Sequence, residues 1–182
     1  MKNLFEFLNV HYDNAIEIKE KFKITEKKEW NNIITLLELN VQVGHLFNVK
    51  NHNKIYDEKD RNISNLGDEL SDVLLQLCYL LYLEKVDLRK LSKYNCDIYN
   101  INILPILIGQ LTEAIMEKED YRYKKVRVGF NNINDFIDDR LFKIIIIIYN
   151  YATEEGYNMI NEFSMMQKDA CRFLSDYATA NL

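Results

Sequence analysis

The chain has 182 residues, which is enough for one domain or for two small half-domains packed together, with a sizeable core in either case. Hydrophobic residues make up 48% of the sequence and charged residues 28%, a balance that excludes global disorder. The net charge of -5 disfavours a general nucleic-acid-binding protein, because such proteins present a basic surface.

The sequence contains few residues that break helices: one proline and five glycines. This scarcity favours long helices joined by short connections over a sandwich or a barrel, so we expect an all-α helical bundle. Three cysteines without a CxxC pair indicate a reduced, cytoplasmic location. The first residues lack the apolar core of a signal peptide, and the apolar run at 142–149 is too short to cross a membrane.

Apolar residues at helical spacing predict the helices in chain order. The predicted helices are 3–23, 26–49, 65–86, 88–95, one from about 104 that carries Pro105 in its first turn, one from 134 or 135 to 155, and 158–178. Polar loops are expected at 48–65, 96–103 and 119–134. Thr25 is the expected N-cap of the second helix, Asn134 or Asp135 that of the sixth, and Gly156 is the residue expected to end it.

Two helix faces are assigned from this spacing. On the first helix Lys19 is placed on the solvent side, together with the neighbouring charged residues. On the second helix an apolar stripe is expected to face the core: Trp30, Ile33, Ile34, Leu37, Val41 and Gly44.

Two short segments recur along the chain. Val43-Gly-His-Leu46 is similar to Ile108-Gly-Gln-Leu111, and Asp68-Glu-Leu-Ser-Asp-Val-Leu74 is similar to Asp135-Phe-Ile-Asp-Asp-Arg-Leu141. The offsets are 109 − 44 = 65 and 139 − 72 = 67, which nearly agree. A duplicated helical unit explains this better than chance similarity between amphipathic helices, so we expect one unit at 1–97 and a more divergent one at 98–182, packed as one compact domain.

Polar residues border the apolar stripes of two successive helices. Glu69 and Asp72 stand three residues apart, while Glu38, Gln42 and His45 share one face of the helix before. If the helices pack antiparallel, these edges meet in one groove, where carboxylates would suit Mg²⁺ and an added imidazole would suit Mn²⁺. The competing interpretation is a solvated acidic edge and a half-buried histidine.

The segment Gly67-Asp-Glu-Leu-Ser-Asp-Val-Leu-Leu75 resembles the second motif of MazG-like all-α nucleoside triphosphate pyrophosphatases. The resemblance implies that Glu69 and Asp72 are metal ligands. The first motif departs from the family pattern, because Gln42 and His45 replace both of its glutamates. The metal site is therefore expected to be weakened, rebuilt with Glu38 as a substitute ligand, or retained as a metal-poor nucleotide pocket. Trp30 fits the family pattern, and Lys93 and Asn95 match its nucleotide-contacting lysine and asparagine weakly. In the second unit only Asp139 remains of the motif carboxylates.

The resemblance implies a pyrophosphohydrolase that releases pyrophosphate from an NTP or dNTP, with Glu38, Glu69 and Asp72 as catalytic residues. Mg²⁺ (or Mn²⁺) would be held by the same three residues and His45. Nucleotide contacts are expected from several residues: Gln42, Lys93, Asn95, Arg122, Lys124, Lys125 and Arg127. A catalytically inactive module that binds a nucleotide or a protein partner is an equal alternative, and an unrelated helical protein is a third. No nucleic-acid polymer or membrane is expected as a partner, and the choice between a monomer and a homodimer stays open.

Overall fold

The computed structural model describes residues 2–52, 65–94 and 100–180. These residues form six α-helices and two short 3-10 helices, without a strand, which confirms the predicted all-α bundle. In chain order the elements are α1 (Lys2–Glu26), α2 (Asn32–His52), α3 (Leu66–Leu83), η1 (Leu88–Lys93), η2 (Ile101–Ile103), α4 (Leu104–Lys118), α5 (Ile133–Glu154) and α6 (Met159–Ala180). None of the described helices is long and apolar enough to cross a membrane.

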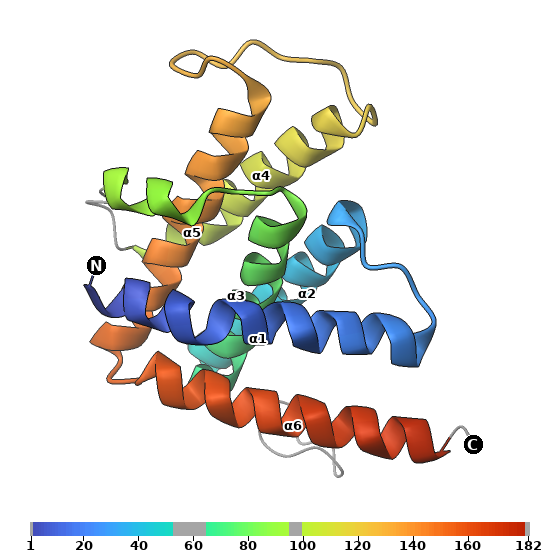
Figure 1. Cartoon of the computed structure of the whole chain (residues 1–182). Helices are drawn as coiled ribbons and strands as arrows, with labels where there is room; N and C mark the ends of the chain where they lie inside the picture. Colours follow the sequence, from blue (N-terminus) through green and yellow to red (C-terminus); the bar gives the residue numbers. More distant parts are fainter. Residues whose placement is uncertain (1, 53–64, 95–99, 181–182) are drawn as a thin grey trace.

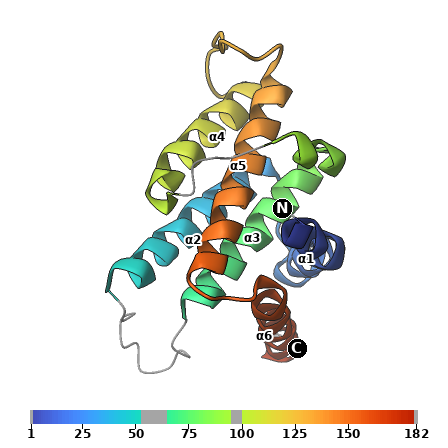
Figure 2. The same ribbon diagram turned by 90° about the vertical axis from the view of Figure 1, so that its left-hand side faces the viewer.

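Four helices form a bundle made of two antiparallel pairs (Figures 1 and 2). One pair is α2 with α3, the other is α4 with α5, and the pairs meet where α3 contacts α5 and α2 contacts α4. The two remaining long helices, α1 and α6, run side by side in the same direction and cross α3 on one side of the bundle. Aromatic contacts join them, among them the rings of Phe7 and Phe163, whose centroids are 5.5 Å apart.

Helix α3 is central because it contacts α1, α2, α5 and α6. Its apolar residues are buried on almost every side, as expected for a helix surrounded by others. Asn65 caps it by accepting a hydrogen bond from the Asp68 backbone N–H at 3.0 Å. Gly67 lies against the start of α6, where an added Cβ would stand 2.6 Å from the Glu162 carboxylate. A larger residue at position 67 would therefore have to displace the side chains of Glu162 and Tyr157.

The predicted start and inward face of α2 were wrong. Helix α1 continues to Glu26, so Thr25 lies inside α1 and is not an N-cap, and Trp30 lies in the connection between the two helices. The core instead contains Leu36, Leu39, Val43, Leu46 and Val49. Three residues of the predicted stripe face solvent: Ile34, Leu37 and Val41 are 41%, 58% and 48% exposed. Helix α2 carries apolar residues on two faces, so spacing alone did not determine which face is buried.

Most remaining boundaries lie within a few residues of the predictions. Pro105 lies in the first turn of α4, and Gly156, with φ +84°, ends α5 as predicted. Helix α5 is capped by Asn132, which accepts from the Asp135 backbone N–H at 2.9 Å, and not by Asn134 or Asp135. The predicted helix at 88–95 is the 3-10 helix η1. The predicted loop at 48–65 lies largely outside the described residues, and the division of the chain at 97 and 98 stays a prediction.

Candidate functional site

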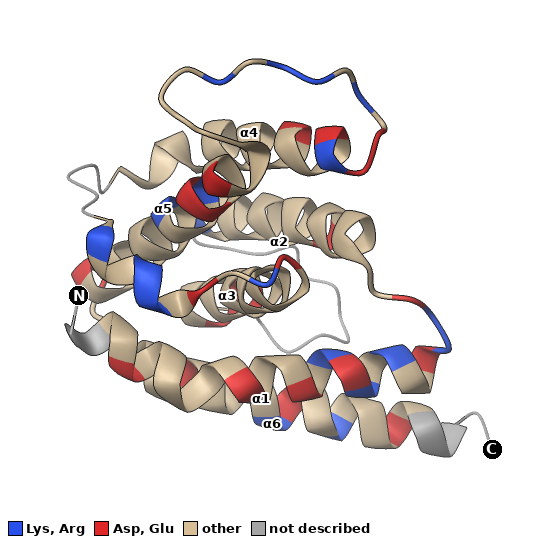
Figure 3. Ribbon diagram, turned by 45° about the horizontal axis from the view of Figure 1, so that its top comes forward, with Lys and Arg blue, Asp and Glu red and all other residues tan. Residues whose placement is uncertain are grey.

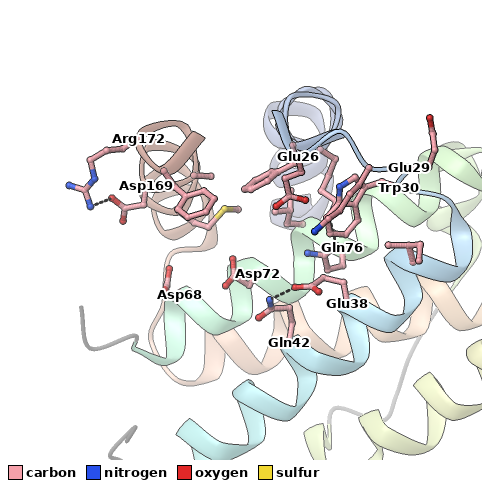
Figure 4. A pocket seen from close by; sticks show the side chains of 18 residues that line it. Glu26, Glu29, Trp30, Glu38, Gln42, Asp68, Asp72, Gln76, Asp169 and Arg172 are labelled. Carbon is pink, nitrogen blue, oxygen red and sulfur yellow. Dashed lines mark hydrogen bonds and ion pairs between the residues drawn. The ribbon is translucent and has the colours of Figure 1, made fainter. Parts of the chain in front are cut away.

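A cleft of about 990 Å³ opens between α1, the connection after it, α2, α3 and α6 (Figure 4). Each of three helices lines it with residues about one turn apart, and α6 closes it with Met166, Ala170 and Phe173. Helix α1 contributes Lys19, Phe22 and Glu26, helix α2 contributes Ile34, Glu38 and Gln42, and helix α3 contributes Asp68, Asp72 and Gln76. Residues four apart lie on one helix face, which explains why these side chains point into the same space.

Glu38 of α2 and Asp72 of α3 project into the cleft from neighbouring helices, as Figure 4 shows. The Gln42 side-chain NH₂ donates a hydrogen bond of 2.8 Å to the Glu38 carboxylate. Burial raises the pKa of Asp72 to about 7, and the negative charges of Asp68, Glu69 and Glu38 add to this, against the opposing effect of Lys19. The antiparallel pair α2–α3 thus brings together two of the predicted carboxylates and the predicted amide.

Lys19 is buried in the wall of the cleft, with only 2% of its surface exposed, which corrects its predicted position on the solvent side. Its Nζ donates to the Gln76 side-chain oxygen at 2.9 Å and lies 3.2 Å from the centre of the Trp30 ring. Burial lowers the pKa of Lys19 to about 7, while the charges of Glu38, Glu26 and Asp72 raise it.

The sequence contained a signal for this position. The buried stripe of α1 runs through Ala15, and Lys19 follows it by four residues, on the same helix face.

Two buried polar atoms of cleft residues lack a hydrogen-bond partner among the described residues. They are the indole N–H of Trp30 and the side-chain oxygen of Gln42. A buried polar group without a partner carries a desolvation penalty, and ligands often remove that penalty in binding sites. One donor and one acceptor that both belong to the cleft therefore support a ligand that offers the complementary groups.

The structure does not bring all four predicted metal ligands together. His45 is exposed, Glu69 is buried with 6% of its surface accessible, and neither lines the cleft that holds Glu38 and Asp72. Within 2–52, 65–94 and 100–180, no group of three or more histidine, cysteine, aspartate or glutamate side chains could hold a metal ion. The carboxylates with which α3 lines the cleft are those of Asp68 and Asp72, four residues apart, and not those of Glu69 and Asp72.

The basic run predicted to contact nucleotide lies in the connection between α4 and α5, at the end of the bundle opposite α6 (Figure 3). Arg127 forms an ion pair of 2.7 Å with the mostly buried Glu117, and the Lys125 backbone N–H donates to the same carboxylate. Arg122 and Lys125 form ion pairs with Glu113. These pairs explain most of the basic run as a structural feature that holds the connection to α4.

The other predicted nucleotide contacts also lie away from the cleft. Lys124 and Lys93 are exposed and do not line it, and Asn95 falls outside the described residues. On α5, Asp138 forms an ion pair with Lys90 at 2.6 Å, and Asp139 forms ion pairs with Arg140 and Lys143. Asp139 is the motif carboxylate expected in the predicted second unit, and these cations pair with it.

Comparison with known proteins adds no relative to this description. No protein-family model, no curated protein and no solved structure matches the chain.

Proposed function

We propose that this chain is a nucleotide-binding helical protein of the MazG-like type, in which the cleft between α1, α2, α3 and α6 holds the nucleotide. The observation that carries the proposal is that Glu38 and Asp72 face one cleft beside Trp30. These residues come from the two helices and the connection on which the family resemblance rests. An aromatic ring next to hydrogen-bonding side chains suits a nucleobase, which stacks through its face and donates or accepts at its edge.

The arrangement of the helices supports the proposed duplication. The similar segments at an offset of 65 residues lie on α2 and α4, and those at an offset of 67 residues lie on α3 and α5. These four helices form two antiparallel pairs. A tandem copy of one helical pair would produce this arrangement within one chain. The cytoplasmic location and the choice between monomer and homodimer stay predictions.

Several contacts favour binding over hydrolysis. The amide of Gln42 occupies one oxygen of Glu38, and the predicted ligands Glu69 and His45 are directed elsewhere. The residues present do not fit a resident Mg²⁺ site, because only two of the four predicted ligands line the cleft and the ammonium group of Lys19 acts on both of them. A charge-assisted ligand contributes about 1.5–3 kcal/mol, so two missing ligands would weaken metal binding by roughly 10²- to 10⁴-fold.

Pyrophosphohydrolase activity on an NTP or dNTP is the second candidate. The observation in its favour is the same pair of cleft carboxylates, because Mg²⁺ is often bound by one or two carboxylates together with the phosphates of a nucleotide. In this case the metal would arrive with the substrate.

One experiment separates the two candidates. The wild-type protein, Asp72→Asn and the exposed control His45→Ala are heated with a panel of NTPs and dNTPs, and pyrophosphate release is measured in parallel with Mg²⁺ or Mn²⁺. Binding without hydrolysis predicts a rise in melting temperature and no pyrophosphate. Pyrophosphate release that Asp72→Asn abolishes and His45→Ala retains would establish the second candidate. Neither stabilisation nor release by any nucleotide would refute the proposal.

A further inference from the structure

The outer side of α2 carries an apolar stripe that the single chain leaves exposed. Ile34, Leu37, Val41 and Gly44 follow one another at intervals of three and four residues, which places them on one helix face. The first three are 41%, 58% and 48% exposed, and the core residues of α2 lie on the opposite face. A periodic apolar stripe on a helix is typical of a buried face, so this stripe indicates a surface that a partner covers.

Helix α4 extends this surface. Figure 2 shows α2 and α4 on one side of α3 and α5, with α1 and α6 on the other side. Helix α4 presents Ile106, which is 62% exposed, and Gly109, and these repeat Val41 and Gly44 at one offset (106 − 41 and 109 − 44, both 65). At 1.5 Å per residue and about 10 Å in width, the outer sides of the two helices cover roughly 500 Å² in projection. This area is of the order of the roughly 800 Å² that each partner contributes to a standard interface.

The charge of the stripe suits a second copy of this chain. The net charge of the chain is -5, so two copies repel each other unless the surfaces in contact are free of charge. The exposed positions of α2 from Ile34 to His45 contain no Lys, Arg, Asp or Glu, and Glu38 points into the cleft. A partner with a charged surface would lose the hydration of its charges here without gaining an ion pair.

The stripe is also complementary to itself. In an antiparallel pair of α2 helices with a two-fold axis between positions 40 and 41, position 37 of one copy faces position 44 of the other. Leu37 is the most exposed large side chain of the stripe, and Gly44 has open space above it, where an added Cβ would meet no atom within 4 Å. The Leu37 side chain of each copy would fill the space above Gly44 of the other copy.

We propose that this chain forms a homodimer through the outer sides of α2 and α4, with the two α2 helices antiparallel across a two-fold axis beside Val41. Of the stripe only Ile34 also lines the cleft, so the dimer does not depend on the proposed function.

The first test measures the mass of the protein in solution by sedimentation equilibrium at micromolar concentrations. Val41→Lys places two ammonium groups beside the axis, and Val10→Lys is the matched control, because Val10 lies on α1 and is 47% exposed, against 48% for Val41. We expect twice the mass of one chain for wild type and Val10→Lys, and the mass of a single chain for Val41→Lys. A monomeric wild type would overturn the proposal, as would a dimer that Val41→Lys leaves intact or that Val10→Lys also dissociates.

The second test uses a cysteine pair to check the register, in a chain whose Cys96 and Cys171 are replaced by serine. Leu37→Cys and Gly44→Cys lie about 10 Å apart along one helix, beyond the roughly 7 Å between Cα atoms that a disulfide spans, so oxidation can join them only between copies. We expect a covalent dimer from the double variant and none from either single variant. No covalent dimer from the double variant, or one from a single variant, would overturn the arrangement. If Val41→Lys does not fold, the wild-type mass and this cysteine pair decide.

Discussion

Replacing Asp72 by asparagine should remove a large pH dependence of stability. The carboxyl is mostly buried and stands near three other carboxylates, so its pKa is raised in the folded protein from 3.8 to about 7. The difference, 7 − 3.8, is about 3 units, and at about 1.4 kcal/mol per unit it corresponds to roughly 4 kcal/mol. This figure is an upper bound, because water reaches part of the cleft.

The sign follows from proton linkage. Between pH 4 and pH 7 the folded protein holds a proton on Asp72 that the unfolded chain releases, so the contribution of this group is fully present below pH 4 and is lost as the pH rises through 7. Asparagine cannot ionise and resembles the protonated carboxyl. The free energy of unfolding of Asp72→Asn, relative to wild type, should therefore increase by up to about 4 kcal/mol from pH 4 to pH 7.

Urea denaturation at several pH values, followed by circular dichroism, measures this difference. Asp176→Asn serves as the control, because it removes a carboxylate from the exposed end of α6. A difference between Asp72→Asn and wild type that stays constant from pH 4 to pH 7 would refute the reasoning, since it would mean that Asp72 ionises in the folded protein as it does in water.

Three further substitutions test other parts of the structure. Arg127→Met leaves Glu117 buried without its ion-pair partner, so urea denaturation should show a decrease of about 3–5 kcal/mol in the free energy of unfolding. Nucleotide affinity should not change, and weaker binding would place Arg127 in the site. Ile145→Ala creates a cavity in the core and should lower the free energy of unfolding by about 2–5 kcal/mol. A smaller decrease would contradict the full burial of Ile145. His45→Glu introduces the glutamate that MazG-like pyrophosphatases have at the corresponding position, here on an exposed face outside the cleft. It should not confer Mn²⁺ binding in a paramagnetic resonance titration, and a gain of binding would show that residue 45 reaches the metal position.

Sequence spacing predicted a helix well where the apolar residues leave no choice of which face is buried. Helix α3 is apolar on nearly all sides, so its assignment did not depend on which face was selected. Helix α2 has two apolar faces, and the selected face is the exposed one, because only tertiary packing decides between them. The cap of α5 lies two or three positions before the predicted one: asparagines and an aspartate stand on both sides of the helix start, and Asn132 is the one whose side chain accepts from the free N–H group of Asp135.

The candidate site was predicted in part. Glu38, Gln42 and Asp72 meet in the cleft, as predicted, because α2 and α3 pack antiparallel. Lys19 was missed because lysine was assigned to solvent by residue type, although its position continues the buried stripe of α1. The basic run near residue 125 was assigned to nucleotide because its partners, Glu113 and Glu117, face it only after α4 and the following connection are folded.

Isothermal titration of a cleft-blocking variant tests the central claim most directly. Ala170 lines the cleft from α6, so Ala170→Trp should narrow the space without changing a charge, and Met165→Trp places the same side chain on an exposed position of that helix. We predict that wild type and Met165→Trp bind one nucleotide per chain with equal affinity and that Ala170→Trp binds it more weakly. Equal binding by all three proteins, or no binding by the wild type, would contradict the assignment of this cleft as a nucleotide site.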